Sequence, residues 1–367
     1  MKVTKKILGN LEKAYALAPI IYQGQPHFLV ASELEKPCLL FDLAGNQKDV
    51  VWEKPGGVMS MVYVPGSNGQ FLTTHRFYSF NDAEDAVISV VTPMEQGNWH
   101  IQTLVKLPYV HRIDIVERGG VRYLIACQLK SGQEYENDWR FPGKLYAAVL
   151  PDDLMQFNED HPLALTLLRD DLPRNHGYYR VMQGEIPTCI ISAESGVYSV
   201  IPPETPGASW TTETLVNDPA SDAVLCDFDG DGLQELGVIS PFHGDRVRIY
   251  HQQNGTYQMV YEYEKSIPFC HGFFGGSLWG RQRLVVGHRS GDRDLISFTY
   301  DAARSSYVCE QLDHDVGPAN LLVCQEDGTD ILIAANREID EIAMYLPEEN
   351  VEKRSAEYAG RVKAGGI

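Results

Sequence analysis

A short apolar run that ends in a cluster of polar or charged residues recurs along the whole chain, and this repeat restricts the possible folds more than any other feature. The copies are HFLVASELEKP from His27, GQFLTTHRFYS from Gly69, VRYLIACQLKS from Val121, PTCIISAESGV from Pro187, ELGVISPFHGD from Glu235, RLVVGHRSGDR from Arg283 and DILIAANREID from Asp330. Gly, Pro, Asn or Asp interrupts the apolar pattern every few residues, which is typical of strands joined by turns. The chain is therefore predicted to be all-β.

Seven copies at a spacing of roughly 40 to 65 residues fit the four-stranded blades of a β-propeller and are too far apart for the rungs of a solenoid. We predict one seven-bladed β-propeller over residues 1–350 and a C-terminal tail over 351–367. The predicted blades cover 15–53, 57–105, 110–168, 176–215, 221–265, 270–310, and 317–346 together with 2–8.

The two chain ends are expected to share the last blade. Only three strands follow Asn320, and an unpaired sheet edge is unfavourable, so Lys2–Leu8 is predicted to close the ring as the fourth strand. Six blades with a separate tail are the alternative.

The charge balance restricts the class of partner. The chain has 31 Lys and Arg against 50 Asp and Glu, a net charge of −19, which repels nucleic-acid backbones and anionic lipids. The basic N-terminus lacks the apolar segment of a secretion signal, and no stretch approaches the ~18 apolar residues of a membrane-spanning helix. We therefore expect a cytoplasmic protein that acts on a small molecule and binds neither nucleic acid nor membrane. The seven cysteines stand singly and are expected to be small buried hydrophobes.

One turn has the spacing of a calcium loop. In DFDGDGLQE, carboxylates stand at positions 1, 3, 5 and 9 around glycines, so Asp227, Asp229, Asp231 and Glu235 are predicted to bind Ca²⁺. The alternative is a tight turn, which Asp and Gly also favour. With this motif the chain resembles the FG-GAP and VCBS repeats of integrin-type propellers, a resemblance that implies the propeller fold.

Histidines gather at one predicted face of the ring. In a propeller the first strand of each blade starts, and the second ends, at the upper mouth of the central channel, and seven of the eleven histidines fall at these positions. Because first strands begin closest to the axis, His111, His176 and His271 are the predicted ligands of a divalent transition metal, Zn²⁺, Mn²⁺, Ni²⁺ or Fe²⁺. A histidine in a turn or core is the alternative for each one singly.

Other polar residues at the same mouth are predicted to surround a substrate. The predicted catalytic residues are His75, Lys130, His288 and Arg289. The predicted substrate-binding residues are Arg76, Asp138, Trp139, Tyr178, Asn336 and Arg337. Asp138 and Trp139 belong to an insertion after the second strand of blade 3, where aromatic faces beside acids and bases are suited to a sugar-like molecule. An ordinary surface loop is the alternative.

The chemistry expected at this mouth is metal-assisted proton transfer. The sequence has no GxSxG, no Walker loop, no GxGxxG after a strand and no CxxCH. A metal beside His and Lys fits a lyase, dehydratase or isomerase acting on a small sugar-derived carbonyl compound. In its axial histidines the chain resembles propeller enzymes of the aldos-2-ulose dehydratase/isomerase type. The alternatives are a non-catalytic propeller that binds a protein or glycan, and a metal-dependent hydrolase.

Overall fold

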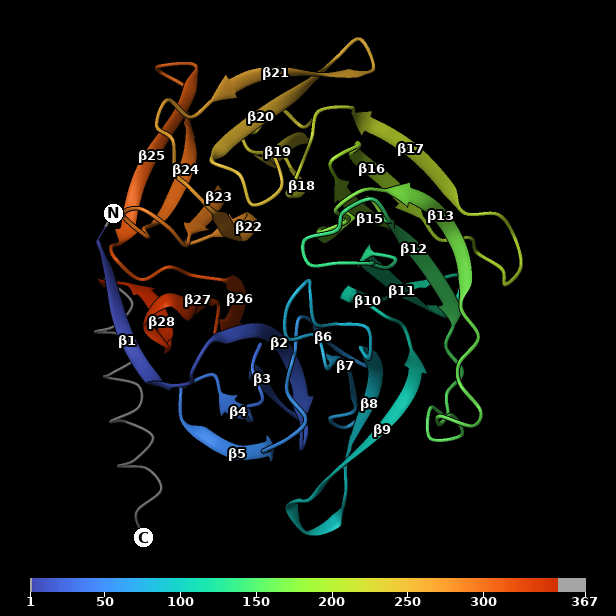
Figure 1. The fold of residues 1–367 in the computed structure, drawn as a ribbon. Helices are drawn as coiled ribbons and strands as arrows, with labels where there is room; N and C mark the ends of the chain where they lie inside the picture. Colours follow the sequence, from blue (N-terminus) through green and yellow to red (C-terminus); the bar gives the residue numbers. More distant parts are fainter. Residues whose placement is uncertain (1, 349–367) are drawn as a thin grey trace, which may run out of the picture.

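The computed structural model describes residues 2–348 as seven four-stranded antiparallel sheets arranged around a central axis (Figure 1). The all-β, seven-bladed prediction is confirmed, and the six-bladed alternative is wrong. The inner strands β2, β6, β10, β14, β18, β22 and β26 contact one another in a ring. The predicted tail over 351–367 lies outside the described residues.

Each blade consists of strands in chain order from the axis outward, except the last. Blades 1 and 2 contain β2 (Ala14–Tyr22), β3 (Gln25–Ser32), β4 (Cys38–Asp42), β5 (Gln47–Trp52), β6 (Met61–Tyr63), β7 (Phe71–His75), β8 (Val87–Pro93) and β9 (Trp99–Lys106). Blades 3 and 4 contain β10 (Val110–Arg118), β11 (Val121–Lys130), β12 (Pro142–Val149), β13 (Thr166–Leu172), β14 (Gly177–Gln183), β15 (Ile186–Ala193), β16 (Gly196–Ile201) and β17 (Thr211–Val216).

Blades 5 and 6 contain β18 (Asp222–Cys226), β19 (Glu235–Ser240), β20 (Arg246–Gln253), β21 (Thr256–Glu262), β22 (Cys270–Leu278), β23 (Arg281–His288), β24 (Leu295–Asp301) and β25 (Ser306–Asp313). Blade 7 contains β26 (Asn320–Glu326), β27 (Thr329–Asn336), β28 (Glu341–Pro347) and β1 (Val3–Asn10). Two 3-10 turns, Glu95–Gly97 and Arg337–Ile339, complete the regular structure.

The ring closes through the N-terminal strand, as predicted. β1 pairs antiparallel with β28, from Val3 opposite Pro347 to Asn10 opposite Glu341. Lys5 adds ion pairs to Glu341 at 2.7 Å and to Asp313 of blade 6 at 3.0 Å. The sheet edge that three C-terminal strands alone would leave open is therefore covered.

The repeated run in the sequence corresponds to the second strands. β7 and β19 are buried at every residue, whereas the outer strand β21 has no buried residue, because second strands lie between neighbouring blades on both faces. A large apolar side chain buried there contributes about 1.5–3 kcal/mol. The buried strands therefore carry the apolar signal that made the repeat visible.

No helix of residues 2–348 is long and apolar enough to span a membrane.

Candidate functional site

Four inner strands place a ring side chain at equivalent positions beside the axis. Tyr15, His111 and His271 are the second residues of β2, β10 and β22, and His176 immediately precedes β14. All four side chains belong to residues that are at most 3% exposed. The upper mouth of the channel is therefore lined by three imidazoles and one phenol.

A β-bulge directs three of these side chains. The pairing of β2 with β3, β10 with β11 and β22 with β23 shifts register around Tyr15, His111 and His271 respectively. A bulge leaves one residue unpaired and re-aims its side chain. The same irregularity in three blades turns these residues away from the sheet ladders.

His176 reaches the axis because its neighbour is glycine. A Cβ on Gly177 would lie 2.4 Å from the carbonyl oxygen of Ser221, so any larger residue would push β14 away from blade 5. A fourth imidazole, His243, comes from the turn after β19, with its backbone in the left-handed region at φ 47°.

The first ring nitrogen of three histidines is held by an oxygen acceptor. The Nδ1 atom of His271 lies 2.6 Å from the Ala319 carbonyl oxygen, and that of His111 lies 3.3 Å from the His176 carbonyl oxygen. The Nδ1 atom of His176 lies 3.0 Å from Oδ2 of Asp222. An Nδ1–H that donates to such an acceptor leaves the lone pair on Nε2, which fixes the tautomer needed for metal binding.

The Nε2 atoms face one another. Nε2 of His176 and Nε2 of His243 are 3.2 Å apart, close to the roughly 3.3 Å expected between two nitrogen ligands of a tetrahedral Zn²⁺. One nitrogen from each of His176, His243 and His271 lies within 4.8 Å of the others. The ring of His111 is 4.6 Å from that of His176, but His111 does not belong to this group of mutually close donors. The Tyr15 hydroxyl lies 3.5 Å from Nε2 of His111 and 3.0 Å from Nε2 of His271. His243 thus completes the group with two of the three predicted ligands, a role that the sequence analysis did not assign to it.

Burial keeps three of the imidazoles, those of His111, His243 and His271, uncharged. Loss of solvent lowers the pKa of His111, His243 and His271 well below the usual value, with a further contribution from neighbouring cationic side chains. The same burial raises the pKa of Tyr15 to about 12, so its hydroxyl stays protonated and lies 3.0 Å from Nε2 of His271. Neutral imidazoles are the protonation state that binds a metal ion.

Aromatic side chains cover the histidines from above. The ring of Phe242 lies 4.0 Å from that of His243 and 5.4 Å from that of Trp139. Trp139 belongs to the insertion between β11 and β12, and the guanidinium of Arg174 lies 4.9 Å from its ring centre. The predicted loop therefore reaches the imidazoles through Phe242, whose ring packs against both Trp139 and His176.

Three of the four predicted catalytic residues, His75, Lys130 and His288, do not gather around this centre. His75 is fully buried against Trp52 and bonds to Ser89 at 3.0 Å, with its pKa lowered to about 3 by burial. Lys130 lies 5.1 Å from the Tyr109 ring centre and 5.2 Å from that of Trp139, and burial lowers its pKa. The ammonium group of Lys130 therefore packs against the Tyr109 and Trp139 rings and helps to hold the insertion in place.

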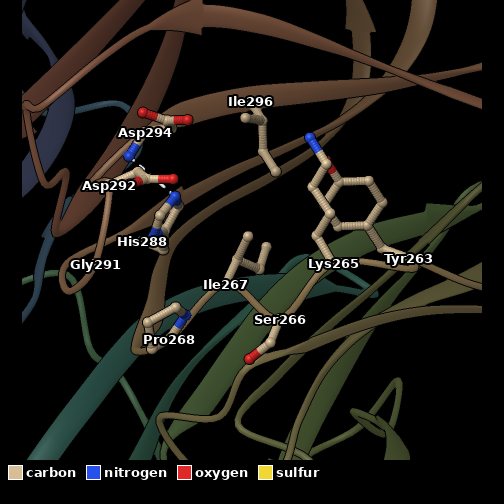
Figure 2. Close-up of a pocket in the computed structure, with 10 residues that line it drawn as sticks. All are labelled: Tyr263, Lys265, Ser266, Ile267, Pro268, His288, Gly291, Asp292, Asp294 and Ile296. Carbon is tan, nitrogen blue, oxygen red and sulfur yellow. Dashed lines mark hydrogen bonds between the residues drawn. The ribbon is translucent and has the colours of Figure 1, made fainter.

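The remaining two predicted catalytic residues lie between blades 5, 6 and 7. His288 bonds to the Ser290 carbonyl at 2.9 Å and lines a small pocket of about 200 Å³ with Tyr263, Lys265 and Asp294 (Figure 2). Arg289 pairs with Glu338 at 2.8 Å and lies 4.5 Å from the ring centre of Phe269.

The predicted substrate-binding residues are dispersed. Asp138 is buried and accepts hydrogen bonds from the guanidinium of Arg140 in its own loop. The Tyr178 hydroxyl donates a hydrogen bond to Asp114 at 2.6 Å, between blades 3 and 4. Asn336 donates to Glu341 at 2.8 Å inside blade 7, and Arg337 pairs with Glu33 across the junction of blades 7 and 1. Arg76 is exposed at a positive φ of 64°. Of this set, only Trp139 belongs to the aromatic cover.

The predicted calcium loop follows β18, at the end of blade 5 opposite the imidazoles. Donor atoms of Asp229, Asp231 and Glu235 lie within 4.8 Å of one another, and His251 of β20 joins them. Asp227 instead accepts bonds from the backbone N–H groups of Gly230 at 2.7 Å and Gly232 at 3.1 Å.

Comparison with known proteins supports the fold alone. No family model matches the chain, and no curated protein matches it, so the resemblance to FG-GAP and VCBS repeats stays a prediction. Among solved structures, the chain is similar to the Dos1 propeller, with 8% sequence identity and a TM-score of 0.56 over 94% of both chains. The shared property of the two chains is the propeller architecture.

Proposed function

We propose that this propeller is a metal-dependent lyase or isomerase that acts on a small polyhydroxylated carbonyl compound at the upper mouth of its channel. The observation that carries the proposal is the convergence of His176, His243 and His271, whose nitrogen donors lie within 4.8 Å of one another. Three imidazole ligands would leave coordination positions open, as in catalytic zinc sites.

The groups around the imidazoles support a metal in preference to a hydrogen-bonded core. A metal-binding histidine characteristically donates its second ring N–H to a carboxylate or a backbone carbonyl. Asp222 provides the carboxylate for His176, and Ala319 provides the carbonyl for His271. The 3.2 Å contact between Nε2 of His176 and Nε2 of His243 fits either a shared metal ion or a hydrogen bond from a His243 that carries its hydrogen on Nε2, so metal content decides between the two.

Two further side chains are placed to move a proton. A bound divalent metal would polarise a carbonyl or hydroxyl oxygen of the substrate. The Tyr15 hydroxyl lies between Nε2 of His271 at 3.0 Å and Nε2 of His111 at 3.5 Å, so its hydrogen can turn toward either nitrogen. Tyr15, protonated because of its raised pKa, would donate the proton, and His111, whose pKa burial lowers well below the usual value, would accept a hydrogen bond rather than act as a strong base.

Nearby guanidinium groups favour an oxygen-rich or anionic substrate. Arg112 and Arg289 both lower the pKa of His271 through their charge, and Arg174 does so for His243. A positive local potential would attract an enediolate or carboxylate despite the net charge of −19, since distant surface charges are screened.

The proposal is tested by metal loading and activity on the full chain. Chelator-treated protein is loaded separately with Zn²⁺, Mn²⁺, Ni²⁺ and Fe²⁺ and assayed on keto-sugars and sugar acids by NMR for loss of water or isomerisation. We expect His271→Ala to lower bound metal by one equivalent per chain and to abolish turnover. The matched control is His100→Ala, which removes an exposed histidine of β9. If His176→Ala and His271→Ala both keep the metal and the activity, the proposal is wrong.

The second candidate is a non-catalytic propeller with a buried metal. The observation that favours it is the near-complete burial of His176 and His271, with the ring of Phe242 packed 5.4 Å from that of His176. This alternative gives the same loss of metal in His271→Ala but no turnover by any loaded form. A metal-dependent hydrolase is distinguished in the same assay by its products.

A further inference from the structure

A second cluster of ligand atoms lies at the opposite end of blade 5. β18 begins with Asp222, beside the axial imidazoles, and runs to Cys226, so its length separates the two clusters by about 17 Å. The cluster consists of Asp229 and Asp231 from the turn after β18, Glu235 at the start of β19 and His251 of β20. It shares no residue with the axial group.

His251 directs one nitrogen at three carboxylates. Its Nε2 atom lies 3.0 Å from Oδ2 of Asp231, 3.7 Å from Oε1 of Glu235 and 3.9 Å from Oδ2 of Asp229. Its Nδ1 atom lies 3.0 Å from the Gln252 carbonyl oxygen, an acceptor that places a hydrogen on Nδ1. A lone pair on Nε2 facing three carboxylates is repulsive, so a cation must stand between them, either a proton or a metal ion.

The buried side chain of Glu235 gives a second, independent indication that this cation is a metal ion bound from solution. Its side chain is completely buried, and its Oε2 atom accepts the backbone N–H groups of Phe228 at 2.6 Å and Asp229 at 3.2 Å. Its Oε1 atom is buried with no hydrogen-bond partner within residues 2–348 and faces His251. An unpartnered buried carboxylate oxygen is costly, and a metal ion would remove that cost.

The donor set is unsuited to the calcium ion that the loop spacing alone predicts. Ca²⁺ takes six to eight oxygen ligands, whereas an imidazole nitrogen suits Zn²⁺ and similar transition metals. Asp227, the first position of the loop, accepts the N–H groups of Gly230 and Gly232 and does not belong to the group of mutually close donor atoms. Three carboxylates and one imidazole remain.

We infer that Asp229, Asp231, Glu235 and His251 form a second metal site, selective for Zn²⁺ or Mn²⁺ over Ca²⁺. The ion fastens the turn between β18 and β19 to the neighbouring strand β20. Its role is local and structural, because it joins two parts of one blade. It does not depend on the activity proposed for the channel.

The experiment measures metal binding by the full chain in a background that lacks the axial site. In the His176→Ala/His271→Ala protein, chelator-stripped and then titrated, we expect one equivalent of Zn²⁺ to bind and to raise the melting temperature. Adding His251→Ala should weaken that binding about tenfold or more, as should adding Glu235→Gln. Addition of His100→Ala, the exposed histidine of β9, is the matched control and should change nothing.

Three outcomes would overturn the inference. Tight Ca²⁺ binding that excludes Zn²⁺ would restore the calcium loop of the sequence pattern. Zn²⁺ binding that survives His251→Ala would place the ion elsewhere. Absence of any bound metal would show that a protonated His251 is the resident cation, which the ¹⁵N shift of its Nε2 atom would report directly. Should the axial substitutions prevent folding, the same titrations on wild-type and His251→Ala chains must differ by one equivalent.

Discussion

The two candidate metal clusters differ in how the chain assembles them. The axial group draws His176, His243 and His271 from three blades, whereas the cluster around Glu235 lies wholly within blade 5. The imidazoles of His176 and His271 are buried, whereas Asp229 and Asp231 of the second cluster lie partly in solvent. A centre assembled from three blades depends on the packing between those blades, whereas a centre within one blade depends only on the turn after β18 and the neighbouring strands. Substitutions that disturb the packing between blades should therefore affect the axial group and leave the cluster of blade 5 unchanged.

The largest expected effect is a loss of stability caused by a substitution at the interface where the ring closes. Phe28 is fully buried, stacks on Phe41 at 5.3 Å, and packs in the core shared by blades 7 and 1. Phe28→Ala should cost about 3–5 kcal/mol of stability, because it leaves a cavity in that core. We expect a lower denaturation midpoint, measured by fluorescence, with unchanged metal affinity at the blade 5 turn of the folded protein. A stability equal to wild type would contradict the closure of the ring through this core.

A smaller effect, confined to the metal affinity of the axial group, is expected when the carboxylate that accepts a hydrogen bond from His176 is replaced. Asp222→Asn keeps the shape of the side chain but removes the charge that orients Nδ1 of His176. Axial metal affinity should fall about 10–100-fold, measured by competition with a chelator. Binding at the blade 5 turn should not change. The exposed Asp152, changed to Asn, is the matched control.

A backbone change tests how His176 reaches the axis. Gly177→Ala would bring a Cβ within 2.4 Å of the Ser221 carbonyl oxygen and displace β14, at a cost of about 1–3 kcal/mol. Axial metal binding should weaken while the blade 5 turn stays unaffected. Gly9→Ala is the control, since a Cβ there has no atom within 4 Å. Equal affinities in both variants would show that His176 is not positioned by this contact.

A pH-dependent effect, which is absent near neutral pH, separates burial of a histidine from metal binding. His75 is fully buried away from both clusters, and burial lowers its pKa to about 3, whereas the unfolded chain binds a proton near pH 6.5. The unfolded state therefore holds more protons between these values, and stability should fall as pH drops from 6.5 toward 3, by about 1.4 kcal/mol per pH unit. The pH dependence of the unfolding free energy of His75→Gln should be shallower by that amount, whether or not metal is present. Parallel curves for both proteins would contradict this.

The fold was predictable because its signal is repeated and local. Each second strand is buried between two blades and so reads as a continuous apolar run, and the three-strand count after Asn320 implied closure by the N-terminus. The repeat alone predicts which residues of each blade lie near the axis. The propeller geometry therefore needed no knowledge of individual contacts.

The composition of the axial group was only partly predictable. His111, His176 and His271 stand where strands begin, but the bulges that aim His111 and His271 leave no mark in the pattern. Tyr15 occupies the equivalent position in blade 1, but a pattern of histidines gives no reason to expect a tyrosine there. His243 follows β19, and its approach to His176 depends on the conformation of that turn.

Long-range partners account for the other differences. His251 stands 20 residues after Asp231, and only the pairing of blade 5 strands brings the two side chains together. His288 and Lys130 end their strands as expected, but Asp294 and Trp139 hold them away from the axis. A side chain at the end of a strand has several directions open to it, and spacing does not choose among them.

The most direct test of the account is the position of a metal in the channel. Crystals of the full chain loaded with Zn²⁺ should show an anomalous peak about 2.0–2.1 Å from the Nε2 atoms of His176, His243 and His271. The peak should be lost in His271→Ala. An anomalous map of the loaded protein with no density among these three imidazoles would contradict the proposed metal centre.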